Sequence, residues 1–217
     1  ISVGNLAIGG AGKTPHVEYL IRLLKPYIDV GTLSRGYNRK TKGFKFVYQQ
    51  DNADQVGDEP LMYARKYKDI VVAVGESRSM AIPEMMRKYP RLQTIILDDA
   101  FQHRSVVPDL NIMLTQYELP FTRDFILPAG RLRERRASYE RADILIVSKC
   151  PDGLTLAEKQ KLIDEIKPYE YQRVFFSAYR YFDPYSMFDP SIRIQLEDIH
   201  HLLIISAIAN TSYLMKQ

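Results

Sequence analysis

A glycine-rich stretch near the start of the chain ends in a lysine and a threonine, a combination suited to holding phosphate groups. Glycines allow positive backbone φ angles, so several N–H groups can converge on phosphate oxygens. Lys13 can reach the β and γ phosphates of a nucleotide, and the Thr14 hydroxyl can ligate Mg²⁺. The stretch consists of Gly9, Gly10, Ala11, Gly12, Lys13 and Thr14. It predicts a phosphate-binding loop (P-loop) for a nucleoside triphosphate.

The residues around this loop have the pattern that such a loop requires. Residues 1–3 form a short apolar run that predicts a strand, and residues 17–24 carry apolar side chains at helical spacing before Pro26. Ala7 replaces the glycine that usually opens the motif, which removes flexibility at one turn position only. Ile8 stands where partition-type ATPases carry an extra lysine, and this argues against that branch.

Two adjacent acids are candidate metal-site residues. A P-loop needs a carboxylate at the end of a neighbouring strand to hold Mg²⁺. The apolar residues 95–97 lead directly into Asp98 and Asp99. Both acids are therefore candidates, although one of the pair could instead cap a following turn.

A second acidic segment has two open interpretations. Asp58 or Glu59 could cap the helix that Pro60 begins. Alternatively, Asp58 faces the phosphates and accepts the proton of an acceptor hydroxyl. The residue pattern alone favours the cap. His103 could orient a phosphate or an acid, or it could have a structural role.

Arginines gather in segments that could meet phosphate oxygens. Arg131 and Arg133 lie in one cluster and Arg35 in another. Planar guanidinium groups match phosphate oxygens bidentately, and an arginine near the γ-phosphate stabilises charge during phosphoryl transfer. Glu134 could pair with these arginines or join the metal shell. The alternative for each cluster is a solvated surface.

The remaining apolar runs alternate with helical patterns. Predicted strands cover residues 30–33, 70–74, 94–97, 111–114, 144–147, 174–176 and 202–205, and a helix is predicted over residues 154–166. Such alternation predicts an α/β fold of the P-loop NTPase type, with a mostly parallel sheet and helices on both faces. We expect one domain over residues 1–217.

Two stretches interrupt the alternation. Residues 40–54 are polar, with a short strand at residues 44–47, and form a hairpin or an excursion. Residues 117–136 predict a long loop, and long loops in compact domains are usually functional or disordered.

Composition places limits on the protein. The chain has 217 residues with a net charge of +4, and 46% of the residues are hydrophobic, which is typical of a globular protein. The single cysteine, Cys150, excludes an internal disulfide and fits a reducing compartment. The absence of a basic stripe with stacking aromatics argues against a nucleic-acid partner. Because the chain begins inside a predicted strand without Met, we expect a fragment truncated at both ends.

Five motifs follow one another along the chain. They are Val3-Gly4-Asn5 through Pro15, Leu33-Ser34-Arg35-Gly36-Tyr37, Gly57-Asp58-Glu59-Pro60, Asp98-Asp99-Ala100-Phe101-Gln102-His103, and Leu127-Pro128-Ala129-Gly130-Arg131-Leu132-Arg133-Glu134. In this order they resemble tetraacyldisaccharide 4'-kinase, the lipid A 4'-kinase family of Gram-negative bacteria, and together they span nearly the whole chain. A weaker sixth match is Ile208-Ala209-Asn210.

The resemblance implies a kinase that uses ATP and Mg²⁺. The implied acceptor is the 4'-hydroxyl of a lipid A disaccharide 1-phosphate, in lipopolysaccharide biosynthesis at the cytoplasmic face of the inner membrane. Lys13 would neutralise the β and γ phosphates, and Asp58 would activate the sugar hydroxyl. The implied metal residues are Thr14, Asp98 or Asp99, and Glu134. Arg133 is a catalytic candidate, and Arg35, His103 and Arg131 are candidate substrate contacts.

The sequence also departs from the family pattern. Ala100 replaces a usual glycine, Arg131 a common proline and Asn38 a common glycine, and none of these changes removes a chemical group. The family's N-terminal membrane helix would precede Ile1. Its Asp-His-His stretch lies beyond the last predicted strand, a place that His200 and His201 do not occupy.

Two other functions remain open at this point. One is a P-loop kinase of another small-molecule acceptor, which would not depend on lipid or detergent. The other is a non-catalytic regulatory module that binds a nucleoside triphosphate and signals through switch loops.

Overall fold

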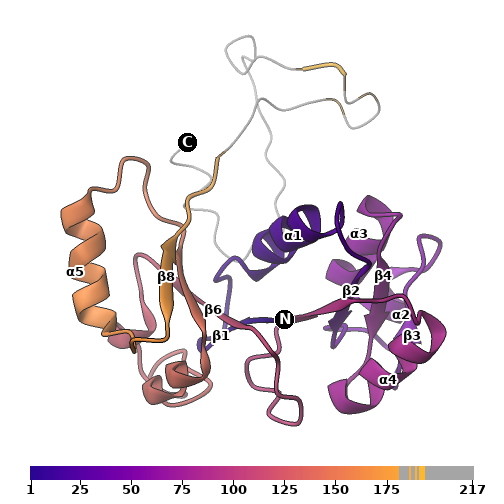
Figure 1. The fold of residues 1–217 in the computed structure, drawn as a ribbon, viewed down its shortest axis with the longest axis horizontal. Coiled ribbons are helices and arrows are strands. Elements are labelled where there is room, and N and C mark those ends of the chain that lie inside the picture. Colours follow the sequence, from indigo (N-terminus) through magenta and orange to yellow (C-terminus); the bar gives the residue numbers. More distant parts are fainter. Residues whose placement is uncertain (181–185, 187–188, 190, 194–217) are drawn as a thin grey trace.

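Short runs that are apolar on both faces form the central sheet of the protein. The computed structural model describes residues 1–180, 186, 189 and 191–193. Within them, eight strands make one sheet in the order β3-β4-β2-β5-β1-β6-β7-β8 (Figure 1). Neighbouring strands are parallel, except that β3 pairs antiparallel with β4. The strands are β1 (Ser2–Asn5), β2 (Val30–Ser34), β3 (Lys45–Phe46), β4 (Val71–Val74), β5 (Thr94–Asp98), β6 (Asn111–Gln116), β7 (Ile144–Ser148) and β8 (Arg173–Phe176).

Helices connect these strands, and the predicted α/β fold is confirmed. The predicted helix over residues 154–166 is α5, which begins at Leu156 because Thr155 and Glu158 form a reciprocal capping box. The helices are α1 (Lys13–Leu24), α2 (Ala53–Val56), α3 (Asp58–Lys66), α4 (Arg78–Lys88) and α5 (Leu156–Ile166), with 3₁₀ turns η1 (Phe121–Arg123) and η2 (Arg136–Arg141). Among the helices of the described residues, none is long and apolar enough to cross a bilayer.

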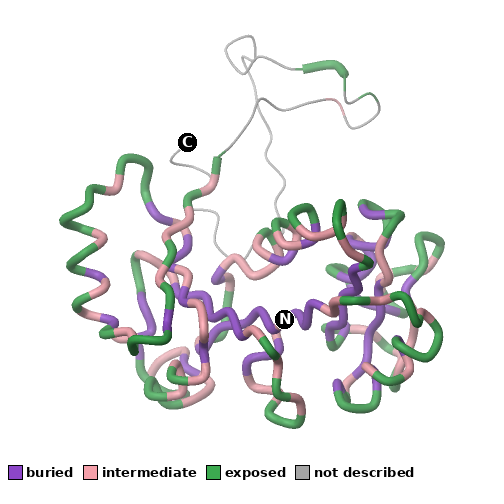
Figure 2. Tube along the Cα trace, viewed as in Figure 1, coloured by how far each residue is buried: buried purple, intermediate pink, exposed green. Residues whose placement is uncertain are grey.

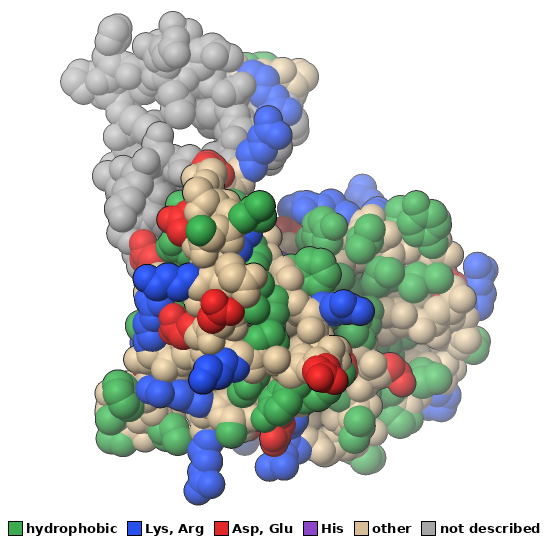
Figure 3. All heavy atoms as spheres, turned by 60° about the vertical axis from the view of Figure 1, so that its left-hand side comes forward, with side chains coloured by type: hydrophobic (Ala, Val, Ile, Leu, Met, Phe, Trp, Pro, Cys, Tyr) green, Lys and Arg blue, Asp and Glu red, His purple; other side chains and the backbone are tan. Residues whose placement is uncertain are grey.

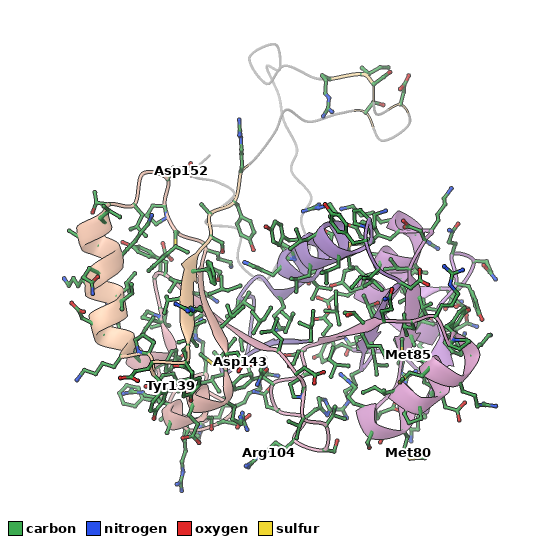
Figure 4. All side chains as sticks on the ribbon, viewed as in Figure 1. Met80, Met85, Arg104, Tyr139, Asp143 and Asp152 are labelled. Atoms are coloured by element: carbon green, nitrogen blue, oxygen red, sulfur yellow. The ribbon has the colours of Figure 1, made fainter. Side chains whose placement is uncertain are left out.

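The two faces of the sheet bury different helices. Along β5, Ile96 belongs to the cluster that contains Val17 and Ile21 of α1, whereas Leu97 belongs to the cluster that contains Met85 of α4. Successive residues of a strand point to opposite faces, so α1 and α4 cover opposite sides. On α4, Met85 lies toward the sheet and Met80 on the outer side (Figure 4). The strands are mostly buried, while the outer sides of the helices are exposed (Figure 2).

The two interruptions of the strand–helix pattern have distinct structures. Strand β3 lies at the edge of the sheet and pairs with β4, and α2 and α3 separate the two strands in the sequence. Residues 40–54 therefore form an excursion and not a hairpin. Residues 117–136 form a long loop, as predicted, with η1 as its helical turn. Isolated β-bridges join Leu132 of this loop to Ala7 and to Ile126. The loop is therefore fixed alongside the start of the glycine-rich segment.

Several sequence expectations lie outside the described residues. They are the predicted strand at residues 202–205, His200, His201 and the segment Ile208-Ala209-Asn210.

Candidate active site

The glycine-rich loop lies between β1 and α1, the position that a phosphate cradle requires. Gly9 has a φ of 100° and Gly12 a φ of 81°, conformations that glycine adopts without a Cβ penalty. Gly12 is the N-cap of α1 and has no side chain that could cap the helix. The free N–H groups of the first helical turn and the positive end of the helix dipole therefore favour an anion at this position.

Lys13 lies in a charged cluster whose members come from three separate segments. Its Nζ donates to Asn5 Oδ1 at 3.1 Å and lies 3.5 Å from Asp99 Oδ1. Arg133 donates to both carboxylate oxygens of Asp99, at 2.8 and 3.2 Å, and to Asn5 Oδ1 at 2.8 Å. The two cations thus share a carboxylate and an amide oxygen at the end of β1.

This cluster keeps Asp99 ionised. Burial alone raises the pKa of Asp99, but the hydrogen bond from Arg133 and the charge of Lys13 outweigh burial, and the pKa lies below its ordinary value. Asp99 has a φ of 48°, so the strand β5 turns sharply after Asp98. The carboxylate of Asp99 pairs with cations, which separates its role from that of Asp98.

Thr14 and Asp98 lie in a second network, next to the first. Thr14 Oγ1 donates to Glu59 Oε1 at 2.7 Å, and the Tyr63 hydroxyl donates to Asp98 Oδ2 at 3.0 Å. Asp98 is 2% exposed. Burial raises the pKa of Asp98 to about 7, and the negative charge of Glu59 adds to this rise. Two carboxylates and a hydroxyl therefore face one another beside the first turn of α1.

A buried arginine fixes the end of β5. The side chain of Arg78, at the start of α4, is fully buried. Its guanidinium donates to the backbone carbonyls of Gly75 and Asp98. The contact to Asp98 O attaches the strand end that carries both acids to the neighbouring strand–helix junction.

The first turn of α3 does not use Asp58 as a cap. The N-cap of α3 is Gly57, which has a φ of 90°, and no side-chain cap bond is present at this helix start in the described structure. Asp58 is the first helical residue and is exposed. The preference for a capping role, drawn from the residue pattern alone, is therefore wrong. The exposed carboxylate follows a glycine and precedes Glu59, which contacts Thr14.

Gly57 also joins two of the sequence motifs. A Cβ at Gly57 would lie 3.1 Å from Gly36 Cα and 3.2 Å from the Tyr37 carbonyl oxygen. The loop that carries Arg35 and the helix start that carries Asp58 are therefore in close backbone contact, which only glycine permits at this position.

Arg35 and His103 lie on the same side of the site. Arg35 is exposed and lines an open pocket of about 730 Å³ together with residues 36–42 and Glu76. Burial lowers the pKa of His103, and the positive charges of Arg78 and Arg35 lower it further. His103 is thus a neutral imidazole near two arginines, in a position suited to an anionic substrate.

Arg131 and Glu134 make contacts apart from the charged cluster. Arg131 Nε donates to Asp124 Oδ2 at 3.1 Å, and its carbonyl accepts from the Ile8 N–H at 2.7 Å. Glu134 Oε2 accepts from Arg141 at 2.8 Å, while Glu134 Oε1 is buried with no partner among the described residues. One oxygen of Glu134 therefore remains available.

A histidine connects the glycine-rich loop to the segment after β8. His16 Nδ1 lies 2.7 Å from Gly12 O, and Nε2 lies 3.0 Å from Ser177 Oγ. Burial lowers the pKa of His16, so the ring is neutral. Because a carbonyl can only accept, Nδ1 carries the proton and Ser177 donates to Nε2. The side chain of Tyr179 also approaches Gly12 closely.

Sequence reasoning missed two contacts in this site. The residue pattern offers Glu59 only as a cap, although Glu59 contacts Thr14. It includes Asn5 only as part of the first motif and predicts no contact for it, although Asn5 contacts Lys13 and Arg133. A local signal for Asn5 exists, because it ends the strand that leads into the loop. The Glu59 contact has no such signal, since it joins residues 45 positions apart.

The residues around Thr14 fit a magnesium ion. Mg²⁺ prefers oxygen ligands and keeps several waters beside one or two carboxylates and substrate phosphates. Thr14, Glu59 and Asp98 supply a hydroxyl and two carboxylates. The pKa of Asp98 is raised by burial first and by the charge of Glu59 second, and a bound cation would favour its ionised form. The described residues contain no group of three or more His, Cys, Asp or Glu side chains that could hold a metal ion by themselves.

Comparisons with known proteins show the family and the fold of the chain. The model of the family Tetraacyldisaccharide-1-P 4'-kinase matches residues 1–217. A solved structure with a similar fold is that of LpxK from Aquifex aeolicus in complex with ATP. The TM-score is 0.62 at 30% sequence identity, and the match covers 87% of this chain and 73% of that one.

Curated relatives share much of the sequence. A tetraacyldisaccharide 4'-kinase from Porphyromonas gingivalis is 48% identical over 183 residues, which cover 83% of this chain and 51% of the relative. A relative of the same name from Bacteroides thetaiotaomicron is 41% identical over 216 residues, which cover 99% of this chain and 57% of the relative. The chain thus spans about half the length of these relatives. It belongs to the tetraacyldisaccharide-1-P 4'-kinase family.

Proposed function

We propose that this protein is an ATP-dependent kinase that phosphorylates the 4'-hydroxyl of a lipid A disaccharide 1-phosphate precursor, a step of lipopolysaccharide biosynthesis. The observation that carries the proposal is the cluster of Lys13, Asp99 and Arg133 beside a P-loop. Two cations held at the end of β1 match the β and γ phosphates of ATP, on which charge shifts during transfer.

The residues of the loop and the cluster divide the work of binding the nucleotide. The backbone of Gly9, Gly10, Ala11 and Gly12 cradles the phosphates. Lys13 neutralises charge between the β and γ phosphates, and Arg133 stabilises the charge that builds up on the γ-phosphoryl group. Their present partner, Asp99, keeps both cations oriented until phosphate oxygens replace it as the acceptor.

Thr14 and Asp98 are the proposed residues for Mg²⁺, with Glu59 as an addition from the structure. Asp99 and Oε1 of Glu134 are further candidates for binding Mg²⁺. When bound, the ion would neutralise negative charge on the β and γ phosphates. The protein contributes oxygen ligands at fixed positions.

Asp58 is the proposed general base. It is exposed at the start of α3, next to Glu59 and therefore close to Thr14. Asp58 would accept the proton of the acceptor hydroxyl while that oxygen forms a bond to the γ-phosphorus. The bond between the γ-phosphorus and the bridging oxygen breaks at the same time, and ADP leaves with the bond's electrons.

Arg35, His103 and Arg131 are proposed contacts for the anionic substrate. Arg35 faces an open pocket, and the neutral His103 beside it can donate or accept a hydrogen bond. Such groups suit the 1-phosphate of the acceptor. We place the protein at the cytoplasmic face of the bacterial inner membrane, because a tetraacyl acceptor resides in a bilayer. The proposal includes no nucleic-acid partner.

The test is the transfer of the γ-phosphate from ATP to a tetraacyl disaccharide 1-phosphate in detergent. We expect transfer by the wild-type protein and a loss of at least about 10²-fold in Lys13→Ala, because an electrostatic group on the transferring phosphoryl is removed. Lys25→Ala is the matched control, since Lys25 lies at the other end of the same helix and pairs with Asp69 on the surface.

Each outcome separates the candidate functions. Transfer that is lost in Lys13→Ala and kept in Lys25→Ala supports the lipid kinase. ATP binding without transfer to this acceptor would contradict it and would favour another small-molecule acceptor or a regulatory nucleotide-binding module.

A further inference from the structure

Exposed apolar side chains gather at the tip of the long loop. Phe125 is 61% exposed, Ile126 44% and Leu127 46%. Ile8, in the glycine-rich segment, is 45% exposed. Three consecutive large apolar residues are thus exposed and do not contribute to the core of the protein. Contiguous exposed apolar patches usually mark an interaction site.

Backbone hydrogen bonds hold this tip beside the P-loop. The Leu132 N–H donates to Phe125 O at 2.8 Å, and the Leu127 N–H donates to Leu132 O at 3.0 Å. On the other side of the same segment, the Ile8 N–H donates to Arg131 O at 2.7 Å. The buried segment around Leu132 therefore lies between the tip and the start of the glycine-rich loop. We call Ile8, Phe125, Ile126 and Leu127 the apolar tip.

The segment that carries the apolar tip is rich in arginine. Residues 124–136 contain the acids Asp124 and Glu134 and the arginines Arg131, Arg133, Arg135 and Arg136. Both acids are paired with arginines, Asp124 with Arg131 and Glu134 with Arg141.

Two of these arginines are exposed, and one of them packs on a ring of the tip. Arg135 and Arg136 are exposed, and the guanidinium of Arg136 lies 4.9 Å from the centre of the Phe125 ring. On the side of the molecule that carries η2 and α5, cationic and apolar side chains intermingle (Figure 3).

We propose that the apolar tip inserts into the headgroup region of an anionic lipid bilayer, with Arg135 and Arg136 contacting lipid phosphates. Apolar side chains with adjacent cations are the combination that binds such an interface, because burial of apolar area and attraction to anionic lipids add together. The positive charges of Arg135 and Arg136 complement the negative charges of lipid phosphates, which identifies an anionic bilayer as the partner of this surface. The inference rests on the proposed function, since docking here would bring the P-loop to the surface where a lipid acceptor lies.

A tryptophan reporter tests this insertion directly. The chain contains no tryptophan, so Phe125→Trp carries a single emitter. With vesicles of phosphatidylglycerol and phosphatidylcholine, we expect a blue shift of its emission and quenching by brominated lipids, and a weaker response with phosphatidylcholine alone. Tyr27→Trp is the matched control, because Tyr27 is 81% exposed and precedes β2, at the amino ends of the parallel strands, whereas the loop of the apolar tip follows the carboxyl end of β6. Its emission is expected to stay unchanged.

Three further variants test the apolar and the cationic parts of this surface by co-sedimentation with vesicles. Ile126→Ser with Leu127→Ser is expected to lower co-sedimentation with anionic vesicles by about tenfold or more, because each apolar side chain contributes to partition. Met86→Ser should leave co-sedimentation unchanged, because Met86 is 53% exposed on α4, outside the apolar tip. Arg135→Gln should weaken binding to anionic vesicles only.

The vesicle experiments need no ATP, so their result is independent of the proposed kinase activity. Transfer in detergent by the double serine variant is expected to equal that of the wild type. Two results would overturn the docking proposal. One is emission of the Phe125→Trp variant that does not change when vesicles bind, and the other is co-sedimentation that the double serine change does not affect. In either case a positive detergent assay would still support the kinase.

Discussion

At the scale of single residues, the site separates two adjacent carboxylates by their surroundings. Asp99 pairs with Arg133 and Lys13, and its pKa lies below the ordinary value. Asp98 is buried beside Glu59, and its pKa is raised to about 7. One acid is therefore stably ionised, while the other is costly to ionise until a cation arrives.

This difference predicts how stability depends on pH in magnesium-free buffer. A carboxyl whose pKa is higher in the folded state binds more protons there, so its contribution to stability is lost as the pH rises from about 4 through about 7. In Asp98→Asn this loss is absent. We expect the free energy of unfolding of the variant, relative to wild type, to rise between pH 4.5 and pH 8.

Urea unfolding at a series of pH values with a chelator present measures this difference. The asparagine amide does not titrate, so its own effect on the free energy of unfolding is the same at every pH. A difference that stays flat across the range would contradict the raised pKa of Asp98.

Asp58 allows its catalytic and structural roles to be distinguished. Because Asp58 does not cap α3, Asp58→Asn should change the free energy of unfolding by less than about 1 kcal/mol, through the helix dipole alone. Loss of the base should lower kcat by at least about 10²-fold. Asp54→Asn, an exposed acid in the first turn of α2, should change neither. Turnover close to wild type in Asp58→Asn would remove Asp58 from the mechanism.

At the scale of elements, one buried acid organises the loop that carries the apolar tip. Asp124 is 6% exposed, and its Oδ1 accepts from the backbone N–H groups of Phe125 at 2.8 Å and Arg131 at 3.0 Å. Burial opposes ionisation, but these bonds and Arg131 hold the pKa of Asp124 below its ordinary value. Gly130 packs so tightly that a Cβ would lie 2.5 Å from Asp124 Oδ1.

Removal of this acid should loosen the loop. We expect Asp124→Ala to lower the free energy of unfolding by about 1–3 kcal/mol, because buried N–H groups lose a charged acceptor. The amides of Phe125 and Arg131 should exchange faster with solvent, as hydrogen exchange with mass analysis measures. Asp152→Ala, at an exposed position outside this loop, is the control. Unchanged protection of these two amides would mean that other contacts hold the loop.

At the scale of the whole molecule, the order of the parallel strands brings the motifs together. Strand β1 lies between β5 and β6, and β2 lies on the far side of β5. After β1, the chain forms β2, β3 and β4 on one side and returns through β5 beside β1. It then forms β6, β7 and β8 on the other side of β1. Ligand sites of open α/β sheets form at the carboxyl ends of strands where the order reverses. The glycine-rich loop follows β1, and Asp98 and Asp99 end the neighbouring strand.

Much of this could be predicted from the sequence, because the signals are local. Apolar runs without alternation predict parallel strands, and the residues from Gly9 to Thr14 adopt a cradle whose φ angles glycine permits. Asp98 could be placed at a strand end for the same reason. The ionisation of the two acids could not be predicted, because it depends on burial and on partners distant in the chain.

The sequence by itself therefore determined the strand–helix alternation, the phosphate cradle and the acids next to it, since each depends on neighbouring residues. Tertiary structure alone decided that Arg133 contacts Asp99 across 34 positions and that Glu59 contacts Thr14 across 45. It also decided that Gly57, which packs against Gly36, occupies the N-cap position of α3, so that Asp58 does not cap the helix. Contacts between distant segments follow from how the sheet is assembled, and no local pattern contains that information.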